Sequence, residues 1–125
     1  MAGKLHDDVY DDGLQVLTDD ANVLHILSAD PGVTTYANIA SYTLGNKSVP
    51  TVGAPEDHTT GRKVTVSAIA DGSVTDTDTA THVALVDTVN SKILAAQELD
   101  ATQAVTDGNT FTLDAFYVAF PAPTA

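Results

Sequence analysis

"RKVTVSAIADGSVTDTDTATHVALVD", residues 62–87, is the stretch whose pattern decides the fold. Apolar and polar residues alternate over Lys63–Ala68, which predicts a strand with one covered face, because neighbouring side chains on a strand point to opposite sides. The pair Asp71-Gly72 predicts a hairpin turn, since glycine adopts the positive φ that tight hairpins need. We expect the chain to return as a polar strand over Ser73–Thr81 and to continue as a buried strand over His82–Asp87.

The region after Asp87 continues this succession of strands and turns. "TVNS" (88–91) predicts a turn, and Lys92–Leu99 predicts a strand that pairs back. "TDGN" (106–109) predicts another turn, which joins a short strand at 102–105 to a last strand at 110–120. The apolar positions of that last strand change parity near Ala115, which indicates a bulge or burial on both faces. The sequence therefore predicts a mainly β fold, an antiparallel β-sandwich or Greek-key barrel.

The first half of the chain adds one helix and two more strands. Within residues 1–20, the segment Leu5–Leu17 predicts an amphipathic N-terminal α-helix, because apolar and acidic side chains separate onto opposite halves. Its apolar half comprises Leu5, Val9, Tyr10, Leu14, Val16 and Leu17. Val23–Ala29 predicts a strand covered on both sides, because apolar residues occur at both parities. A short helical turn capped by Thr34 or Thr35 should then lead into a strand. Two prolines and two glycines predict that Pro50–Gly61 is an exposed loop.

Composition limits both the class of protein and its partners. A chain of 125 residues predicts one domain, 1–125, and the absence of cysteine excludes disulfides, cysteine-ligated zinc and thiol catalysis. The net charge of -12 disfavours nucleic acid and anionic lipid, since both are bound through clustered lysine and arginine. No segment approaches the roughly 20 apolar residues of a membrane span. We expect neither nucleic acid nor a membrane as a partner.

Two aspartates on the predicted polar strand raise the question of a bound ion. Asp76 and Asp78 would lie on one face roughly 7 Å apart, where two like charges in water repel by only about 0.6 kcal/mol. This repulsion needs no compensating cation, so a solvated strand whose charges discourage edge-to-edge aggregation is the favoured interpretation. Two alternatives remain: calcium gathered from separate loops, although the spacing does not match a helix-loop-helix site, and a surface that contacts a partner.

The remaining polar residues form no catalytic pattern. The four histidines, His6, His25, His58 and His82, are too scattered for a metal pair, and His25 and His82 fall within predicted apolar strands. Neither a G-x-S-x-G nucleophile turn nor a phosphate-binding glycine loop occurs. We therefore predict that the protein is not an enzyme and has no cofactor.

Five segments together resemble a family of small proteins encoded among the virion structural genes of tailed bacteriophages. They are "KLHDDVYDDGLQVLTDDAN", "LSADPGVTTYANIASYTLG", "GRKVTVSA", "TATHVALVDTVNSKIL" and "VTDGNTFTLDAFYVAFPAP", and they run nearly from end to end. The resemblance implies a virion component, assembled in the host bacterial cytoplasm, that decorates and cements the head. Its partner would be the major capsid protein or another virion protein, and a homo-oligomer is possible. The alternative is a tail or fibre module that contacts a host surface glycan, with or without calcium.

Two proline-stiffened segments are the predicted partner-binding residues. The first is the loop at 50–61, and the second is the C-terminal tail at 121–125, which follows a strand and is expected to project from the domain. Proline restricts both segments before binding, so less conformational entropy is lost on association. The predicted residues are Pro50, Pro55, Glu56, Asp57, His58, Pro121 and Pro123.

Overall fold

The computed structural model describes residues 7–32, 34–59 and 61–120. Its helices and strands follow the order α1 (Asp7–Asp20), β1 (Val23–Leu27), α2 (Ala37–Tyr42), β2 (Thr43–Ser48), β3 (Glu56–Asp57), β4 (Arg62–Val66), β5 (Ile69–Val74), β6 (Asp78–Asp87), β7 (Lys92–Val105), β8 (Thr110–Leu113) and β9 (Phe116–Phe120). Neither helix in these ranges is both long and apolar enough to cross a membrane. The predicted mainly β, antiparallel fold with one N-terminal helix is confirmed.

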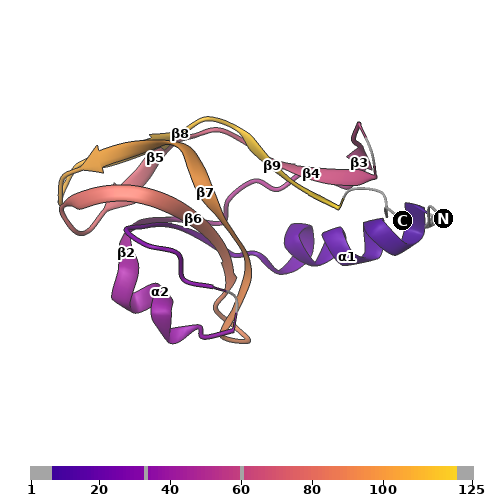
Figure 1. The fold of residues 1–125 in the computed structure, drawn as a ribbon, viewed down its shortest axis with the longest axis horizontal. Helices are drawn as coiled ribbons and strands as arrows, with labels where there is room; N and C mark the ends of the chain where they lie inside the picture. Colours follow the sequence, from indigo (N-terminus) through magenta and orange to yellow (C-terminus); the bar gives the residue numbers. More distant parts are fainter. Residues whose placement is uncertain (1–6, 33, 60, 121–125) are drawn as a thin grey trace.

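Six strands form one curled antiparallel sheet, which we call the half-barrel (Figure 1). Their order is β7-β6-β1-β2-β5-β8, so β1 lies inside the sheet and β7 and β8 are its two edges. The predicted β6–β7 hairpin is confirmed, with Asp87 paired to Lys92 across the turn. The strand predicted at Val23–Ala29 is also confirmed as β1, which ends at Leu27 and pairs with both β2 and β6.

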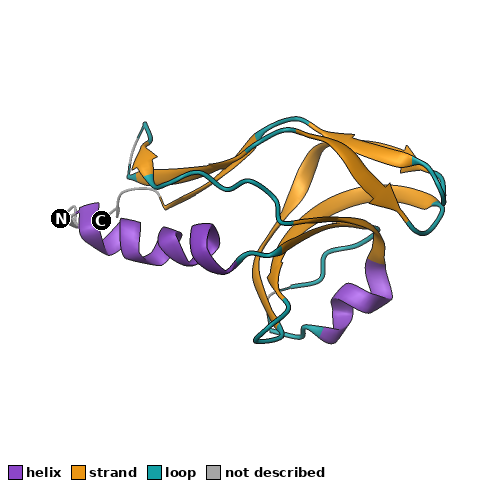
Figure 2. Cartoon of the chain, turned by 180° about the vertical axis from the view of Figure 1, so that it is seen from behind, coloured by secondary structure: helices purple, strands orange, loops and turns teal. Residues whose placement is uncertain are grey.

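The remaining three strands form a small sheet in the order β3-β4-β9. This small sheet and α1 together are called the arm. The arm extends from one end of the half-barrel, with α1 running along the small sheet (Figure 2). Leu14 and Leu17 of α1 are buried in one cluster with Val64 and Val66 of β4. The predicted amphipathic helix is therefore real, although Val16 lies on its exposed side instead of its apolar half.

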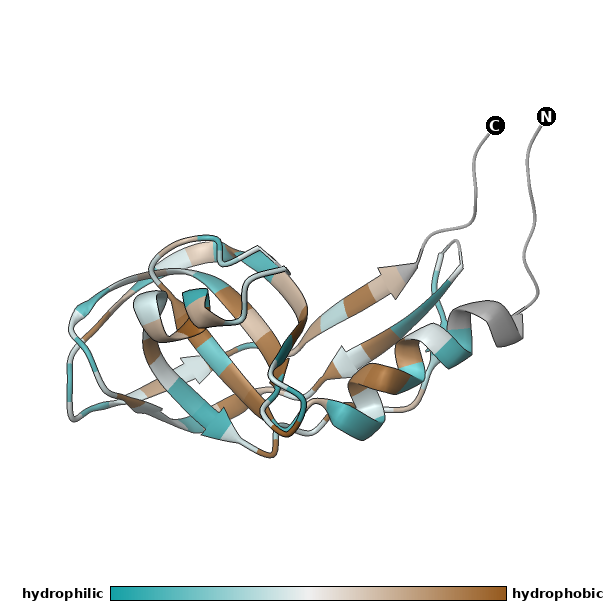
Figure 3. Cartoon of the chain, turned by 90° about the horizontal axis from the view of Figure 1, so that it is seen from below, coloured by the Kyte–Doolittle hydropathy of each residue, from teal (hydrophilic) through white to brown (hydrophobic). Residues whose placement is uncertain are grey.

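Two hydrophobic clusters cover opposite faces of β1, as its mixed pattern predicts. Leu24 and Ile26 belong to the larger cluster, which fills the inside of the half-barrel and continues into the arm. Leu27 belongs to the smaller cluster, where Ile39 of α2 covers the outside of the sheet. Apolar and polar residues alternate along several of the strands (Figure 3), as expected for strands whose two faces meet different surroundings.

The prediction of a hairpin turn at Asp71-Gly72 is wrong. Both residues lie inside β5, where Gly72 is buried and paired with Phe111 of β8. A Cβ atom at Gly72 would lie 2.2 Å from Phe111 Cε1 and Cζ, so this glycine serves the close approach of a ring. The polar strand Ser73–Thr81 is also interrupted, because β5 ends at Val74 and β6 begins at Asp78.

The predicted pairing of the segments around "TDGN" is wrong as well. The turn at 106–109 is present, but it joins β7 to β8 at opposite edges of the half-barrel, and β8 pairs with β5. The parity change near Ala115 has a simple cause. The chain leaves the half-barrel after Leu113 and enters the small sheet at Phe116, so β8 and β9 present their side chains to different surroundings.

Two local predictions need correction. The segment Pro50–Gly61 is not a wholly exposed loop, because Pro50 is buried, β3 pairs with β4, and Val52 forms a bridge with Val66. The helix α2 has Tyr36 at its N-cap without a side-chain capping bond, so neither Thr34 nor Thr35 caps it. The predicted sequence of a short helix followed by a strand is confirmed.

Candidate functional site

The small sheet has one covered face and one open face. Val64 and Val118, which are cross-strand partners, lie on the face that packs against α1. Because side chains alternate along a strand, the intervening residues occupy the other face. We call this surface the outer face, and it comprises Glu56, His58, Lys63, Thr65 and Tyr117.

Tyr117 is the centre of the outer face, with 49% of its surface exposed. Its ring centroid lies 4.7 Å from that of His58 at an interplanar angle of 49°. Lys63 Nζ lies over the Tyr117 ring, 5.3 Å from its centroid, which is within the range of a cation–π contact. Thr65 Oγ1 donates a hydrogen bond of 3.1 Å to Glu56 Oε1 beside it. These contacts hold an aromatic ring, a cation and a carboxylate together on one surface.

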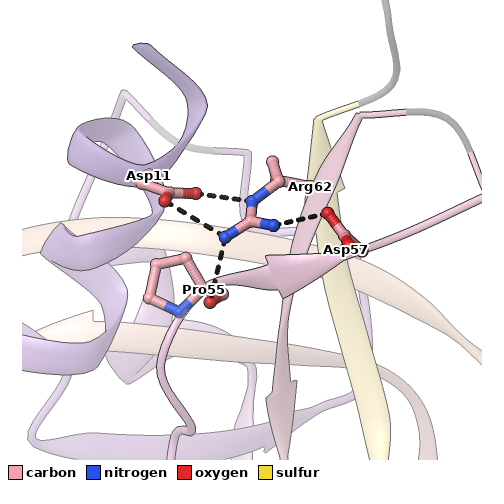
Figure 4. Close-up of polar contacts among 4 residues, drawn as sticks. All are labelled: Asp11, Pro55, Asp57 and Arg62. Atoms are coloured by element: carbon pink, nitrogen blue, oxygen red, sulfur yellow. Dashed lines mark hydrogen bonds and ion pairs between the residues drawn. The ribbon is translucent and has the colours of Figure 1, made fainter. Parts of the chain in front are cut away.

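Arg62 joins α1 to the segment that precedes β4, through Asp11 on one side and Pro55 and Asp57 on the other (Figure 4). Its Nε and Nη2 donate to the two carboxylate oxygens of Asp11, at 2.8 and 3.2 Å. Nη2 also donates to the Pro55 carbonyl at 3.4 Å, and Nη1 donates to Asp57 Oδ1 at 2.5 Å. The Arg62 side chain is only 16% exposed, so these hydrogen bonds are made in a partly desolvated setting.

The structure brings four of the seven predicted partner-binding residues together. Pro55, Glu56, Asp57 and His58 all lie beside β4, two of them in contact with Arg62 and two on the outer face. Pro50 does not belong with them, because it is buried. Pro121 and Pro123 lie outside the described residues.

Tyr117 and Arg62 belong to this site but were not predicted from the sequence. The signal for Tyr117 was present, because it has the opposite parity to Phe116 and Val118 in the same strand. Arg62 is the only arginine in the sequence, but its role depends on the docking of α1, which no local pattern predicts.

Asp76 and Asp78 are exposed but do not share a strand. Asp76 lies in the bend between β5 and β6, and Asp78 is the first residue of β6. Each accepts a hydrogen bond from the next backbone N–H, at 3.1 Å from Thr77 and 2.7 Å from Thr79. Among the described residues, no three acidic, histidine or cysteine side chains are grouped so that they could hold a metal ion.

Three polar side chains of the half-barrel, the partly buried His25 and His82 and the buried Asp87, have structural partners. His25 Nδ1 lies 2.8 Å from Thr43 Oγ1, and burial lowers the pKa of this imidazole below its usual value. His82 Nδ1 lies 2.8 Å from Thr81 Oγ1. Asp87 accepts hydrogen bonds from the Asn90 side chain and from the backbone N–H groups of Val89 and Asn90. These bonds, led by that from the Asn90 amide, lower the pKa of Asp87 and stabilise the β6–β7 turn.

The outer face is therefore a surface suited to contact, because it offers an exposed aromatic ring with a cation and a carboxylate on the same face. Comparison of the chain with known protein families, curated proteins and solved structures finds no match.

Proposed function

We propose that this protein is a structural component of a tailed-bacteriophage virion, a decoration protein that docks on the outside of the head and stabilises the shell. The proposal rests on the near end-to-end resemblance of the sequence to small virion proteins. Its partner is the major capsid protein or another virion protein, encountered during assembly in the bacterial cytoplasm.

The observation that carries a docking role is the outer face of the arm. Tyrosine is enriched at the energetic centres of protein interfaces, because its ring contributes a large contact area and its hydroxyl a hydrogen bond. Here Tyr117 is exposed, while Lys63 and His58 hold its ring in place before any partner arrives. Such preorganisation reduces the entropy lost on docking.

The remaining surface is consistent with a scaffold that keeps its charges outward. The chain carries 17 acidic residues against 5 lysines and arginines, and most of the acidic side chains in the described residues are exposed. A high net charge keeps unassembled copies soluble and separate. Attachment then depends on specific contact at the outer face instead of general adhesion.

The test is reattachment to phage particles that lack this protein. Purified full-length chain and a Tyr117→Ser variant are mixed with such particles, and the bound fraction is measured after sedimentation. We expect Tyr117→Ser to weaken attachment by roughly fivefold or more, as for an aromatic residue at an interface centre. Val89→Ala is the matched control, because Val89 is also an exposed apolar residue but lies in the β6–β7 turn. Equal attachment of all three proteins would refute docking through the outer face, and no attachment of any would refute the head role.

A second function is favoured by the same tyrosine. Exposed aromatic rings near carboxylates are typical of glycan sites, and Tyr117 lies on the outer face with Glu56. Tyr36 and Tyr42 are not available in the same way, because both pack against the smaller cluster. A tail or fibre module would sediment with host cells, and Tyr117→Ser would abolish that binding without changing attachment to heads.

A further inference from the structure

A gap separates the two edges of the half-barrel. β7 and β8 are the end strands of the sheet, and no ladder joins them within the described chain. They are connected instead through a side chain, because Gln103 Nε2 donates a 3.2 Å hydrogen bond to the Thr112 carbonyl. Beside this bond lies a cavity of about 360 Å³, which we call the seam. Its walls are 97–103 of β7, 112–116 at the end of β8 and the start of β9, and Val83 of β6.

The middle of the β7 wall, Leu99–Thr102, is not paired with β6. Gln103 pairs with Ala80 and Glu98 pairs with His82, so the four residues Leu99–Thr102 have no counterparts on β6. This is a large bulge, and bulged residues leave the hydrogen-bonded ladder. Their backbone N–H and C=O groups need other partners, as do those along the outer edge of β7. The seam therefore offers hydrogen bonds of the kind that another strand would make.

The side chains of the seam are rich in hydrogen-bond acceptors and negative charge. Glu98, Asp100 and Asp114 all line the cavity and all are exposed. Gln103 Oε1 is buried without a hydrogen-bond partner in the described part of the chain. A buried carbonyl oxygen without a donor is unfavourable, and water or a ligand that brings an N–H group would satisfy it. These groups favour a ligand that is cationic and rich in donors.

The form of the seam favours an elongated ligand. A second, smaller hollow adjoins the first, since both are lined by Val83, Gln97 and Phe116. It continues along β7 past Ala95 and beside Val118 of β9. The walls are apolar in this direction, and this hollow holds only about 10 Å³, so the seam has an acidic end and a small apolar end beside the edge of β7. This arrangement suits a peptide in the extended conformation, whose side chains alternate between two sides.

We propose that the seam binds an extended, basic segment of a partner protein, which pairs along the free edge of β7. Its apolar side chains lie over Leu99 and Phe116, which are only partly buried, and its lysine or arginine side chains meet Glu98, Asp100 and Asp114. This inference deepens the proposed function, on which it rests, by naming the chemistry of the segment that a virion partner would contribute. The contact is distinct from the outer face, although Phe116 and Tyr117 are neighbours in β9.

The test uses three capped hexapeptides and the full-length, ¹⁵N-labelled chain. In the first peptide valine alternates with lysine, in the second valine alternates with glutamate, and in the third glycine alternates with lysine. Amide chemical shifts are followed during titration. We expect saturable shifts at 97–103 and 112–116 with the valine–lysine peptide. The other two should bind weakly or not at all, because one has the wrong charge and the other has little β-propensity.

Two charge-matched variants separate the seam from the general acidity of the chain. A triple variant of the seam should weaken binding of the valine–lysine peptide by about fivefold or more. Its substitutions are Glu98→Gln, Asp100→Asn and Asp114→Asn. A control variant removes the same charge from exposed positions of α1 and should leave the affinity unchanged. Its substitutions are Asp12→Asn, Asp19→Asn and Asp20→Asn.

Each outcome of this titration decides the inference. Absence of shifts at millimolar peptide, shifts confined to the outer face, or equal loss in both variants would overturn it. Saturable binding at the seam, by a protein that does not attach to phage particles, would support it and reject the phage role. Attachment to particles without any seam binding would reject the inference alone.

Discussion

Replacing Gly72 with alanine would place a methyl group against the ring of Phe111. The added Cβ would lie 2.2 Å from two ring carbons and 2.6 Å from a third, closer than real Cβ contacts occur. The ring cannot simply swing away, because Phe111 is only 1% exposed and is surrounded by the larger core. Either β5 and β8 must separate or the core must repack.

The expected cost follows from these contacts. Overpacking a close-packed core costs about 1–3 kcal/mol, and removing a glycine from a strand returns roughly 0.5–1 kcal/mol of backbone entropy. Because an approach of 2.2 Å is a severe overlap, the overpacking cost should lie in the upper half of its range, about 2–3 kcal/mol, and the net loss in the free energy of unfolding should be about 1–2 kcal/mol. For a chain of this length, that corresponds to a fall in Tm of roughly 4–8 °C. Urea unfolding followed by circular dichroism measures it directly.

A control and a double variant make the reasoning refutable. Gly53→Ala adds the same methyl group where the nearest atom outside the adjacent residues is the Thr65 carbonyl oxygen, at an ordinary 3.5 Å, so its effect should stay within about 0.5 kcal/mol. In the Phe111→Leu background, Gly72→Ala should cost less, with a coupling of at least about 0.5 kcal/mol. An unchanged stability for Gly72→Ala, or an equal cost in both backgrounds, would show that the ring does not require the glycine.

Three further perturbations test other contacts. Asp87→Asn should lower the free energy of unfolding at neutral pH, and the difference from the parent should disappear as the pH falls below about 4. The hydrogen bonds that lower the pKa of Asp87 in the folded state stabilise the fold while the carboxylate is charged, and protonation removes this stabilisation. A difference that does not change with pH in urea unfolding would contradict this. Arg62→Met should cost about 1–2 kcal/mol in unfolding free energy by breaking the fork to Asp11, whereas Asp57→Asn, at an 89% exposed partner, should cost under about 0.5 kcal/mol. Asp76→Asn with Asp78→Asn should change stability by under about 1 kcal/mol, and a calcium-induced rise in Tm that this variant abolishes would instead establish an ion site.

Local patterns were sufficient for the elements whose partners are close in sequence. The helical separation of Leu14 and Leu17 from the acids predicted α1, and the turn before Lys92 predicted the β6–β7 hairpin. Asp71-Gly72 misled because the same dipeptide suits a tight turn and a close approach between strands. Only the pairing of Gly72 with Phe111, far along the chain, distinguishes the two, and it depends on how the sheet curls.

The candidate site was predicted in part, again where its residues are close in sequence. The cluster of polar residues at 56–58 was expected to lie near a partner, and the structure places it beside Tyr117. The seam could not have been foreseen, because it depends on β7 and β8 being edges of one sheet and on a bulge that has no signal in composition. The burial of Pro50 was not predicted, because a proline within a polar stretch is typical of an exposed loop.

The path of the chain between the half-barrel and the arm has a consequence for how the protein can be divided. The chain crosses between them four times, after α1, before β3, after β4 and after β8. The arm is consequently assembled from three separate stretches, 7–20, 56–66 and 116–120. No continuous fragment therefore contains the arm without also containing strands of the half-barrel. A single backbone cut at any crossing divides this cysteine-free chain into two fragments, each carrying part of the arm, so only noncovalent packing would hold the fragments together. We expect arm and half-barrel to unfold in one transition, because neither can complete its core without the strands that the other sends across.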